Sequence, residues 1–129
     1  MNRYFVSRIL GSLVLAAVLG AGAQAAPSAQ VQALVAKRHI DFTDVEPLYR
    51  ETVKRDGAID AAVAELKALS EDSARPRRER ANALLVASHL QWQFGQRPAA
   101  QASVEAGLKI ETSADLALQQ ARLLEAGGE

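Results

Sequence analysis

The sequence contains no cysteine. A disulfide, a thiolate metal site and a catalytic thiol all need that residue, so this chain can form none of them. A lipid-modified bacterial export signal also needs a cysteine after its apolar stretch, so that kind of membrane anchor is excluded. Stability must therefore come from core packing, which a domain of about 100 residues can supply.

Aromatic residues and histidines are also scarce, with one Trp, two Tyr, three Phe and two His. A surface for single-stranded nucleic acid needs aromatic side chains among its basic ones, and the balance of 15 acidic and 15 basic residues gives nucleic acid no attraction. The chain has no His-Glu-x-x-His, Gly-x-Ser-x-Gly or P-loop pattern. We therefore expect a protein that is not an enzyme and that binds neither nucleic acid nor a cofactor.

Residues 1–25 have the organisation of a cleavable export signal. The segment begins with two positive charges and no acidic residue, residues 9–23 are apolar or small, and Ala23 and Ala25 form an A-x-A site. The apolar part is about 15 residues long, whereas a membrane-spanning helix needs roughly 20. We predict that cleavage leaves no stable membrane anchor and that residues 26–129 work in the periplasm or outside the cell.

The remainder of the chain has helical periodicity, and no stretch alternates as a strand does. We therefore expect an all-α domain, with a capping box from Thr43 to Glu46 at the start of its second helix. The helices are predicted near residues 28–38, 43–55, 58–70, 76–94, 98–109 and 113–126.

The helix predicted over residues 76–94 is apolar on two opposite sides. Such a helix is usually sandwiched between neighbours. What stays polar is a narrow strip formed by Asn82, His89 and Gln93. We expect this helix to be the centre of the domain.

A pattern of helix, glycine and second helix occurs twice. Gly57 aligns with Gly95 at an offset of 38 residues, and several alanines match after them. A period of this length built from helical hairpins is typical of α-solenoids. The pattern predicts repeats at approximately 44–75 and 78–112, with a C-terminal capping helix over 113–126.

These residues resemble the tetratricopeptide family in degenerate form. The turn glycines are followed by a small residue early in the second helix and by a bulkier apolar residue one turn later. The small residues are Ala62 and Ala100, and the bulkier ones are Leu66 and Val104. The family's Trp, Leu-Gly and Tyr signature and its closing proline are missing, so a plain helical bundle is the alternative fold.

Proteins of this family commonly bind peptides or protein segments in a concave groove lined by the first helix of each repeat. The resemblance therefore implies a protein or peptide partner for this chain. The corresponding positions are Asp44, Glu51, Lys54 and Arg55 in the first repeat and Asn82, Leu85, His89, Trp92 and Gln93 in the second. Three of them also form the polar strip of the central helix, so two arguments agree on that part of the groove.

Two charged segments carry alternative hypotheses. Residues 39–46 contain one imidazole and three carboxylates, a set that suits a hard cation, although acidic residues are also favoured at a helix N-terminus. Those four residues are His39, Asp41, Asp44 and Glu46. Residues 75–80 hold the one basic cluster, and because positive charge is unfavourable at the start of a helix, contact with an acidic partner is one explanation.

The leading hypothesis is a non-enzymatic exported interaction module, or accessory factor of the bacterial envelope. The alternatives are a small metal-binding protein or enzyme using residues 39–46, and an inhibitor or immunity-type protein. Two repeats are few for a solenoid, so terminal helices must cap the stack or a homodimer must complete its core. Exposure of Leu116 and Leu123 on the last helix would favour the homodimer.

Overall fold

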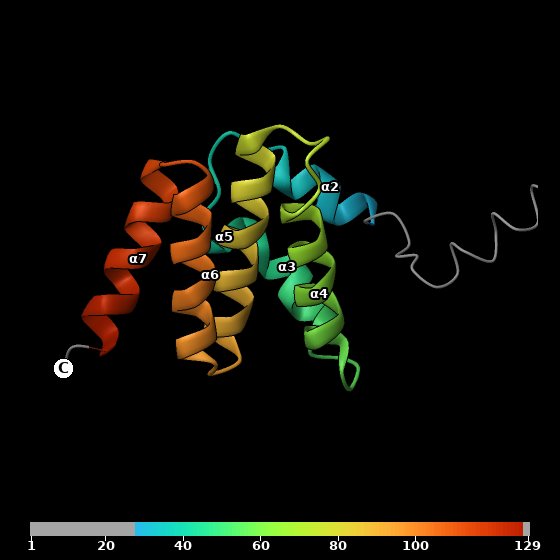
Figure 1. The fold of residues 1–129 in the computed structure, drawn as a ribbon. Helices are drawn as coiled ribbons and strands as arrows, with labels where there is room; N and C mark the ends of the chain where they lie inside the picture. The colour runs from blue at the N-terminus through green and yellow to red at the C-terminus, as the bar shows by residue number, and fades with distance from the viewer. Residues whose placement is uncertain (1–27, 128–129) are drawn as a thin grey trace, which may run out of the picture.

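The computed structural model describes residues 28–127. Within this range the chain forms helices and no strand, as the sequence predicts (Figure 1). The helices are α2 (Ala29–Val35), α3 (Phe42–Thr52), α4 (Ala58–Ser70), α5 (Arg77–Gln93), α6 (Arg97–Ile110) and α7 (Ala114–Gly127). The predicted signal peptide, residues 1–25, lies outside the described residues.

The two turn glycines have the same backbone conformation. Gly57 precedes α4 with φ +78°, and Gly95 precedes α6 with φ +77°. An L-residue with a side chain rarely adopts this left-handed conformation, whereas glycine does so without a steric penalty. Both turns between helices therefore depend on glycine for the same physical reason.

The start of α3 differs from the prediction. Its N-cap is Asp41, whose carboxylate accepts a hydrogen bond from the backbone N–H of Thr43 at 2.9 Å. Asp44 completes the capping box by accepting from the backbone N–H of Asp41 at 3.0 Å. The box expected from Thr43 to Glu46 is thus displaced by two residues, because an aspartate caps a helix N-terminus as well as a threonine does.

Helix α5 is the centre of the domain, as its two apolar sides predict. Every residue from 81 to 91 is buried, because α4 and α6 pack along α5 and because α2, α3 and α7 cover its other sides. Figure 1 shows α4, α5, α6 and α7 standing in a row, with α2 and α3 behind them. Gly107 lets α6 approach its neighbours, since a Cβ there would lie 3.0 Å from Leu116.

The core combines large aliphatic side chains with two polar pairs. The largest fully buried apolar side chains include Leu66, Leu85, Leu90, Leu116 and Leu123, each of which stabilises the fold by roughly 1.5–3 kcal/mol through burial. The polar pairs are Gln91 with Ser103 at 2.7 Å and Gln119 with Ser88 at 3.2 Å. They join α5 to α6 and to α7.

None of the helices within residues 28–127 has the length and hydropathy needed to cross a bilayer.

Candidate functional site

The residues predicted to line a partner groove fall into two groups. Asn82, Leu85 and His89 are buried. The other six are partly or fully exposed, namely Asp44, Glu51, Lys54, Arg55, Trp92 and Gln93. The first group corrects the expectation of an open groove along α5, because those three side chains contact the chain's own helices and not solvent.

The segment from α2 to the start of α3 covers α5 at these positions. The side-chain amide of Asn82 donates to the carbonyl oxygens of Val35 at 2.8 Å and Lys37 at 3.1 Å. Further along the segment, the backbone N–H of Ile40 donates to Asp115 at the start of α7, at 2.8 Å. Residues 28–41 therefore lie across the face of α5 that a groove would need.

His89 is a neutral residue at the edge of the core. Its ring lies 6.0 Å from that of Phe42, measured between centroids. The pKa of His89 is lowered from 6.5 to about 4, chiefly by burial and also by the positive charge of Arg122, while Asp41, Asp115 and Asp44 act in the opposite direction. At neutral pH this imidazole carries no charge, so it offers neither a cation nor an exposed ligand to a partner.

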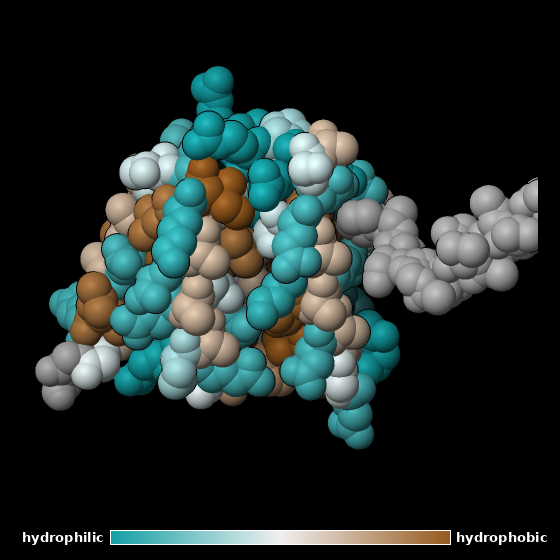
Figure 2. Space-filling view, in the orientation of Figure 1, coloured by the Kyte–Doolittle hydropathy of each residue, from teal (hydrophilic) through white to brown (hydrophobic). Residues whose placement is uncertain are grey.

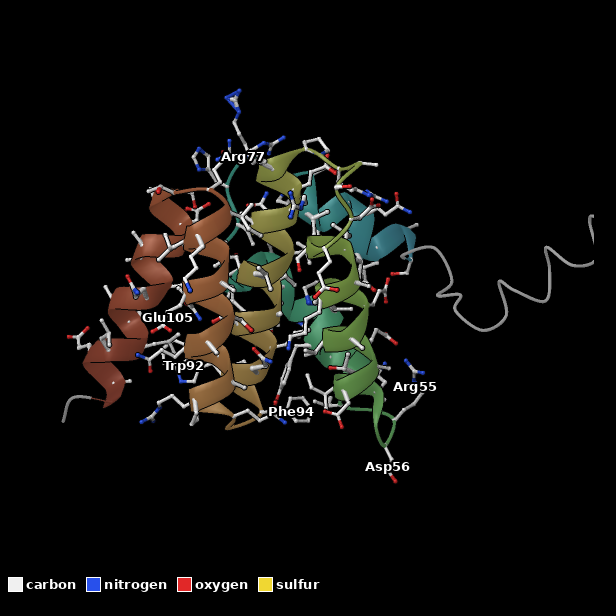
Figure 3. The ribbon with its side chains drawn as sticks, in the orientation of Figure 1. Arg55, Asp56, Arg77, Trp92, Phe94 and Glu105 are labelled. Atoms are coloured by element: carbon white, nitrogen blue, oxygen red, sulfur yellow. The ribbon has the colours of Figure 1, made fainter. Side chains whose placement is uncertain are left out.

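The exposed members of the predicted groove do not form one surface. Lys54 pairs with Glu51 at 3.4 Å at the end of α3, and Arg55 lies in the turn that leads to α4. Trp92 lies near the other end of the row of helices, towards α7 (Figure 3). The structure thus separates the charged positions of the first repeat from the aromatic position of the second.

Each charged side chain of segment 39–46 that was considered for a metal site has another partner within this chain. Asp41 and Asp44 cap α3, and Glu46 pairs with Arg50 at 3.2 Å. His39, whose side chain is 81% exposed, pairs with Asp115 at 3.7 Å. In the described part of the chain, no group of three or more His, Asp or Glu side chains is placed to hold a metal ion.

The basic cluster binds carbonyl oxygens at the C-terminal ends of other helices. The bonds run from Arg77 to Ile110 at 2.9 Å, from Arg78 to Lys37 at 2.9 Å and from Arg80 to Ser70 at 2.8 Å. The last carbonyls of a helix have no partner within it and carry a partial negative charge. Because α2, α4 and α6 all end beside the start of α5, where Figure 3 places Arg77, positive charge is favoured at this end of the domain.

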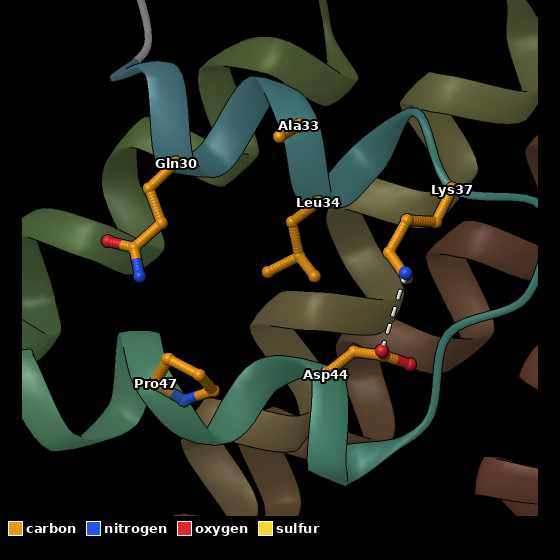
Figure 4. Close-up of a pocket in the computed structure, with 6 residues that line it drawn as sticks. All are labelled: Gln30, Ala33, Leu34, Lys37, Asp44 and Pro47. Atoms are coloured by element: carbon orange, nitrogen blue, oxygen red, sulfur yellow. Dashed lines mark ion pairs between the residues drawn. The ribbon is translucent and has the colours of Figure 1, made fainter.

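An open pocket of about 310 Å³ lies between α2 and α3 (Figure 4). The ion pair between Lys37 and Asp44, at 3.5 Å, lies at one end of it. The remaining lining residues are Gln30, Ala33, Leu34 and Pro47. Asp44 is the one predicted groove residue among them, and its carboxylate is already used by the capping box and by Lys37, so the pocket presents no reactive group.

One surface remains that sequence analysis did not identify. Helix α7 exposes Leu118 (48%) and Leu124 (53%), and Ala114, Ala117 and Ala121 are exposed between and beside them. At 100° per residue these five apolar residues fall within an arc of about 120° on one side of the helix, and the exposed Glu125 lies within the same arc. We call this set the α7 outer face, and Figure 2 shows apolar residues on α7 at the lower left.

Leu116 and Leu123, whose exposure would have favoured a homodimer, are both fully buried. Helix α7 carries leucines on two sides, and Leu116 packs beside Gly107 of α6 while Leu118 points outward. Because only one side of α7 can face the core, the presence of leucines on two sides already indicated that one leucine pair would be exposed.

These surfaces differ in whether other groups of the same chain already contact them. The acidic segment and the basic cluster bind groups of this chain, and Asn82 and His89 of the polar strip are buried against it, whereas the α7 outer face is turned away from the helices described within residues 28–127. No family model matches the chain, and no curated protein or solved structure is significantly similar to it.

Proposed function

We propose that this protein is an exported, non-enzymatic protein–protein interaction module, an accessory factor of the bacterial envelope, and that the α7 outer face is its contact surface. The observation that carries the proposal is the exposure of Leu118 and Leu124 on the last described helix. A helix that ends a stack normally turns a polar side to water. Large apolar side chains exposed on one helix face favour contact with another protein over contact with water.

The arrangement of the helices supports a hairpin stack of tetratricopeptide-like type. In this interpretation α3 and α4 form one hairpin, α5 and α6 the next, and α7 begins a third. Two observations support it: the turn glycines share one conformation, and α7 packs on both α5 and α6, as α5 packs on α3 and α4. The α7 outer face is then the position where a stack would continue, and a partner protein takes that place.

The non-enzymatic part of the proposal rests on how the polar groups are used. His89 is buried and neutral, and His39 lies at the surface beside one carboxylate. The acidic residues of segment 39–46 cap α3 or pair with basic side chains, so none is held ready to act on a substrate. The proposal of export rests on the amino-acid pattern of residues 1–25.

Quantitative affinity capture from an envelope extract tests this function. The baits are the matured wild type, the double variant Leu118→Glu/Leu124→Glu, and Val53→Glu, a control whose residue is 49% exposed and lies at the end of α3, away from α7. We expect proteins that are enriched by the wild type and by Val53→Glu but not by the double variant. If the double variant, shown by circular dichroism to be folded, enriches the same proteins, the proposal is wrong.

A further inference from the structure

Residues 28–40, which we call the α2 segment, dock on the rest of the domain as a short amphipathic helix followed by a non-helical stretch. Val31, Leu34 and Val35 lie at i, i+3 and i+4 on the buried side of α2. Ile40 is a fourth buried side chain, after the helix has ended, and all four belong to the main core cluster. A helix of seven residues is too short to be stable alone in water, so α2 owes its helical form to this docking.

The rest of the domain holds the α2 segment largely by its backbone. The side chains of Asn82 and Arg78 donate hydrogen bonds to the carbonyl oxygens of residues 35–37. The backbone N–H of Ile40 donates to the carboxylate of Asp115. Because every residue except proline carries the same backbone groups, a segment of different sequence can make the same hydrogen bonds.

Two ion pairs of the segment use side chains, and both lie at the surface. Lys37, whose side chain is 46% exposed, pairs with Asp44 at 3.5 Å. His39, whose side chain is 81% exposed, pairs with Asp115 at 3.7 Å. Exposed ion pairs contribute little to stability. What the surface beneath α2 requires of a segment is therefore mainly the spacing of its four apolar side chains.

The α2 segment does not fill the space available to it. The open pocket of about 310 Å³ lies between α2 and α3 and is lined by Ala33 and Leu34 on one side and by Pro47 on the other (Figure 4). Ala33 contributes only a methyl group to this lining. A larger apolar side chain at that position would fill part of the pocket and gain burial that the chain's own segment lacks.

We propose that the α2 segment is a displaceable occupant of a peptide-binding surface, formed by α3, α5 and the start of α7, and that a segment of a partner protein takes its place. The partner's segment carries aliphatic side chains at the positions equivalent to 31, 34, 35 and 40 and a large apolar side chain at the position of Ala33. Binding of an amphipathic helix through such anchors is a common recognition mode. This surface is separate from the α7 outer face, so the inference goes beyond the proposed function.

Peptide binding to the full matured chain tests the proposal. The probe is a fluorescent synthetic peptide of residues 28–41 that carries Ala33→Leu, and its binding is followed by anisotropy. The receptors are the wild type, Val35→Glu, which puts a charge at a buried anchor of the α2 segment, and Val53→Glu, an exposed control at the end of α3. We expect Val35→Glu to bind at least about tenfold more tightly than the other two, because in them the attached segment competes for the surface. Equal binding to all three, or no binding to a Val35→Glu chain that circular dichroism shows to be folded, overturns the proposal.

The sequence of the peptide tests the role of the pocket. The unaltered peptide should bind Val35→Glu roughly tenfold more weakly than the Ala33→Leu peptide, because it leaves the pocket unfilled. A peptide that itself carries Val35→Glu should not bind. Equal affinity of the first two peptides would show that the pocket does not select the partner.

Hydrogen exchange of the wild type gives a measurement that does not depend on how Val35→Glu folds. A saturating amount of the Ala33→Leu peptide should speed the exchange of the chain's own α2 amides severalfold, since the displaced helix is too short to persist, while α6 amides stay unchanged. Unchanged exchange in α2 overturns displacement. In sedimentation velocity, a wild-type dimer that Val35→Glu loses would mean that the segment is exchanged between copies, which overturns a foreign partner.

Discussion

The side-chain amide of Asn82 lies 2.8 Å from the carbonyl oxygen of Val35 and donates a hydrogen bond to it. This bond joins α5 to the last turn of α2 across 47 positions of sequence. The same amide reaches the carbonyl oxygen of Lys37 at 3.1 Å. A polar residue on a buried helix is thus used to hold helix α2 of the same chain, and a partner cannot reach it while α2 is docked.

Replacing Asn82 with alanine should lower the free energy of unfolding by about 1–3 kcal/mol, because the buried carbonyl of Val35 loses its donor. Urea denaturation followed by circular dichroism measures the change. Gln93→Ala, on the exposed side of the same helix, should stay within about 0.5 kcal/mol of the wild type. Equal losses in the two variants would mean that Asn82 does not hold α2.

Arg80 is expected to contribute to folding in the same way. Its side chain donates to the Ser70 carbonyl at the end of α4, at 2.8 Å, in a partly buried position. Arg80→Ala should therefore cost about 1 kcal/mol in the same denaturation assay. Arg38→Ala, an exposed arginine in the loop after α2, serves as the control and should change stability little. A loss of stability in Arg38→Ala but not in Arg80→Ala would contradict the capping role of the basic cluster.

The stability of the fold should depend on pH through His89. Its pKa is lowered from 6.5 to about 4 in the folded chain, chiefly by burial, so the unfolded chain takes up the proton first as the pH falls. The stabilisation is complete above the unfolded pKa of 6.5 and declines down to about pH 4, which amounts to roughly 3 kcal/mol. Thermal or urea denaturation at a series of pH values measures it.

Carboxylates also titrate in this range, so the comparison with a variant isolates the histidine. His89→Phe should lose the His89 part of the slope between pH 6.5 and about 4, whatever its stability at neutral pH. Gln93→Ala, at an exposed and uncharged position of the same helix, should keep the wild-type slope. If the free energy of unfolding depends on pH equally in the wild type and in His89→Phe, His89 is not buried as a neutral residue.

The sequence predicts the helices well because their signals are local. Gly57 and Gly95 mark the turns before α4 and α6, and the two apolar sides of α5 identify the central helix. Contacts between distant segments leave no such signal. The bond from Ile40 to Asp115 crosses 75 positions, and nothing in the local pattern of either residue indicates it.

The same limit explains the errors at the site. A helical wheel places Asn82 and His89 on a polar strip, but it does not show that α2 and α3 cover the strip. On α7 the wheel shows two leucine sets, and only tertiary packing decides that Leu116 faces the core while Leu118 faces outward. Periodicity identifies the faces of a helix, and the fold decides which of them is buried.

The export prediction has its own test. Intact mass and N-terminal sequencing of the protein recovered from cells should give a chain that begins at Ala26. Ala25→Tyr removes the small residue that the peptidase needs and should leave the precursor in the membrane fraction. Recovery of the wild type from the cytoplasm with its original N-terminus would contradict export.

Site-specific photo-crosslinking in living cells is the sharpest test of the α7 outer face as a contact surface, because it records what touches that face under native conditions. A photoreactive residue is introduced at Leu124 in one variant and at Val53 in another, two positions with similar exposure of 53% and 49%. We predict a discrete covalent adduct from position 124 and none of that size from position 53. No adduct from position 124, or the same adducts from both positions, would contradict the proposed contact surface.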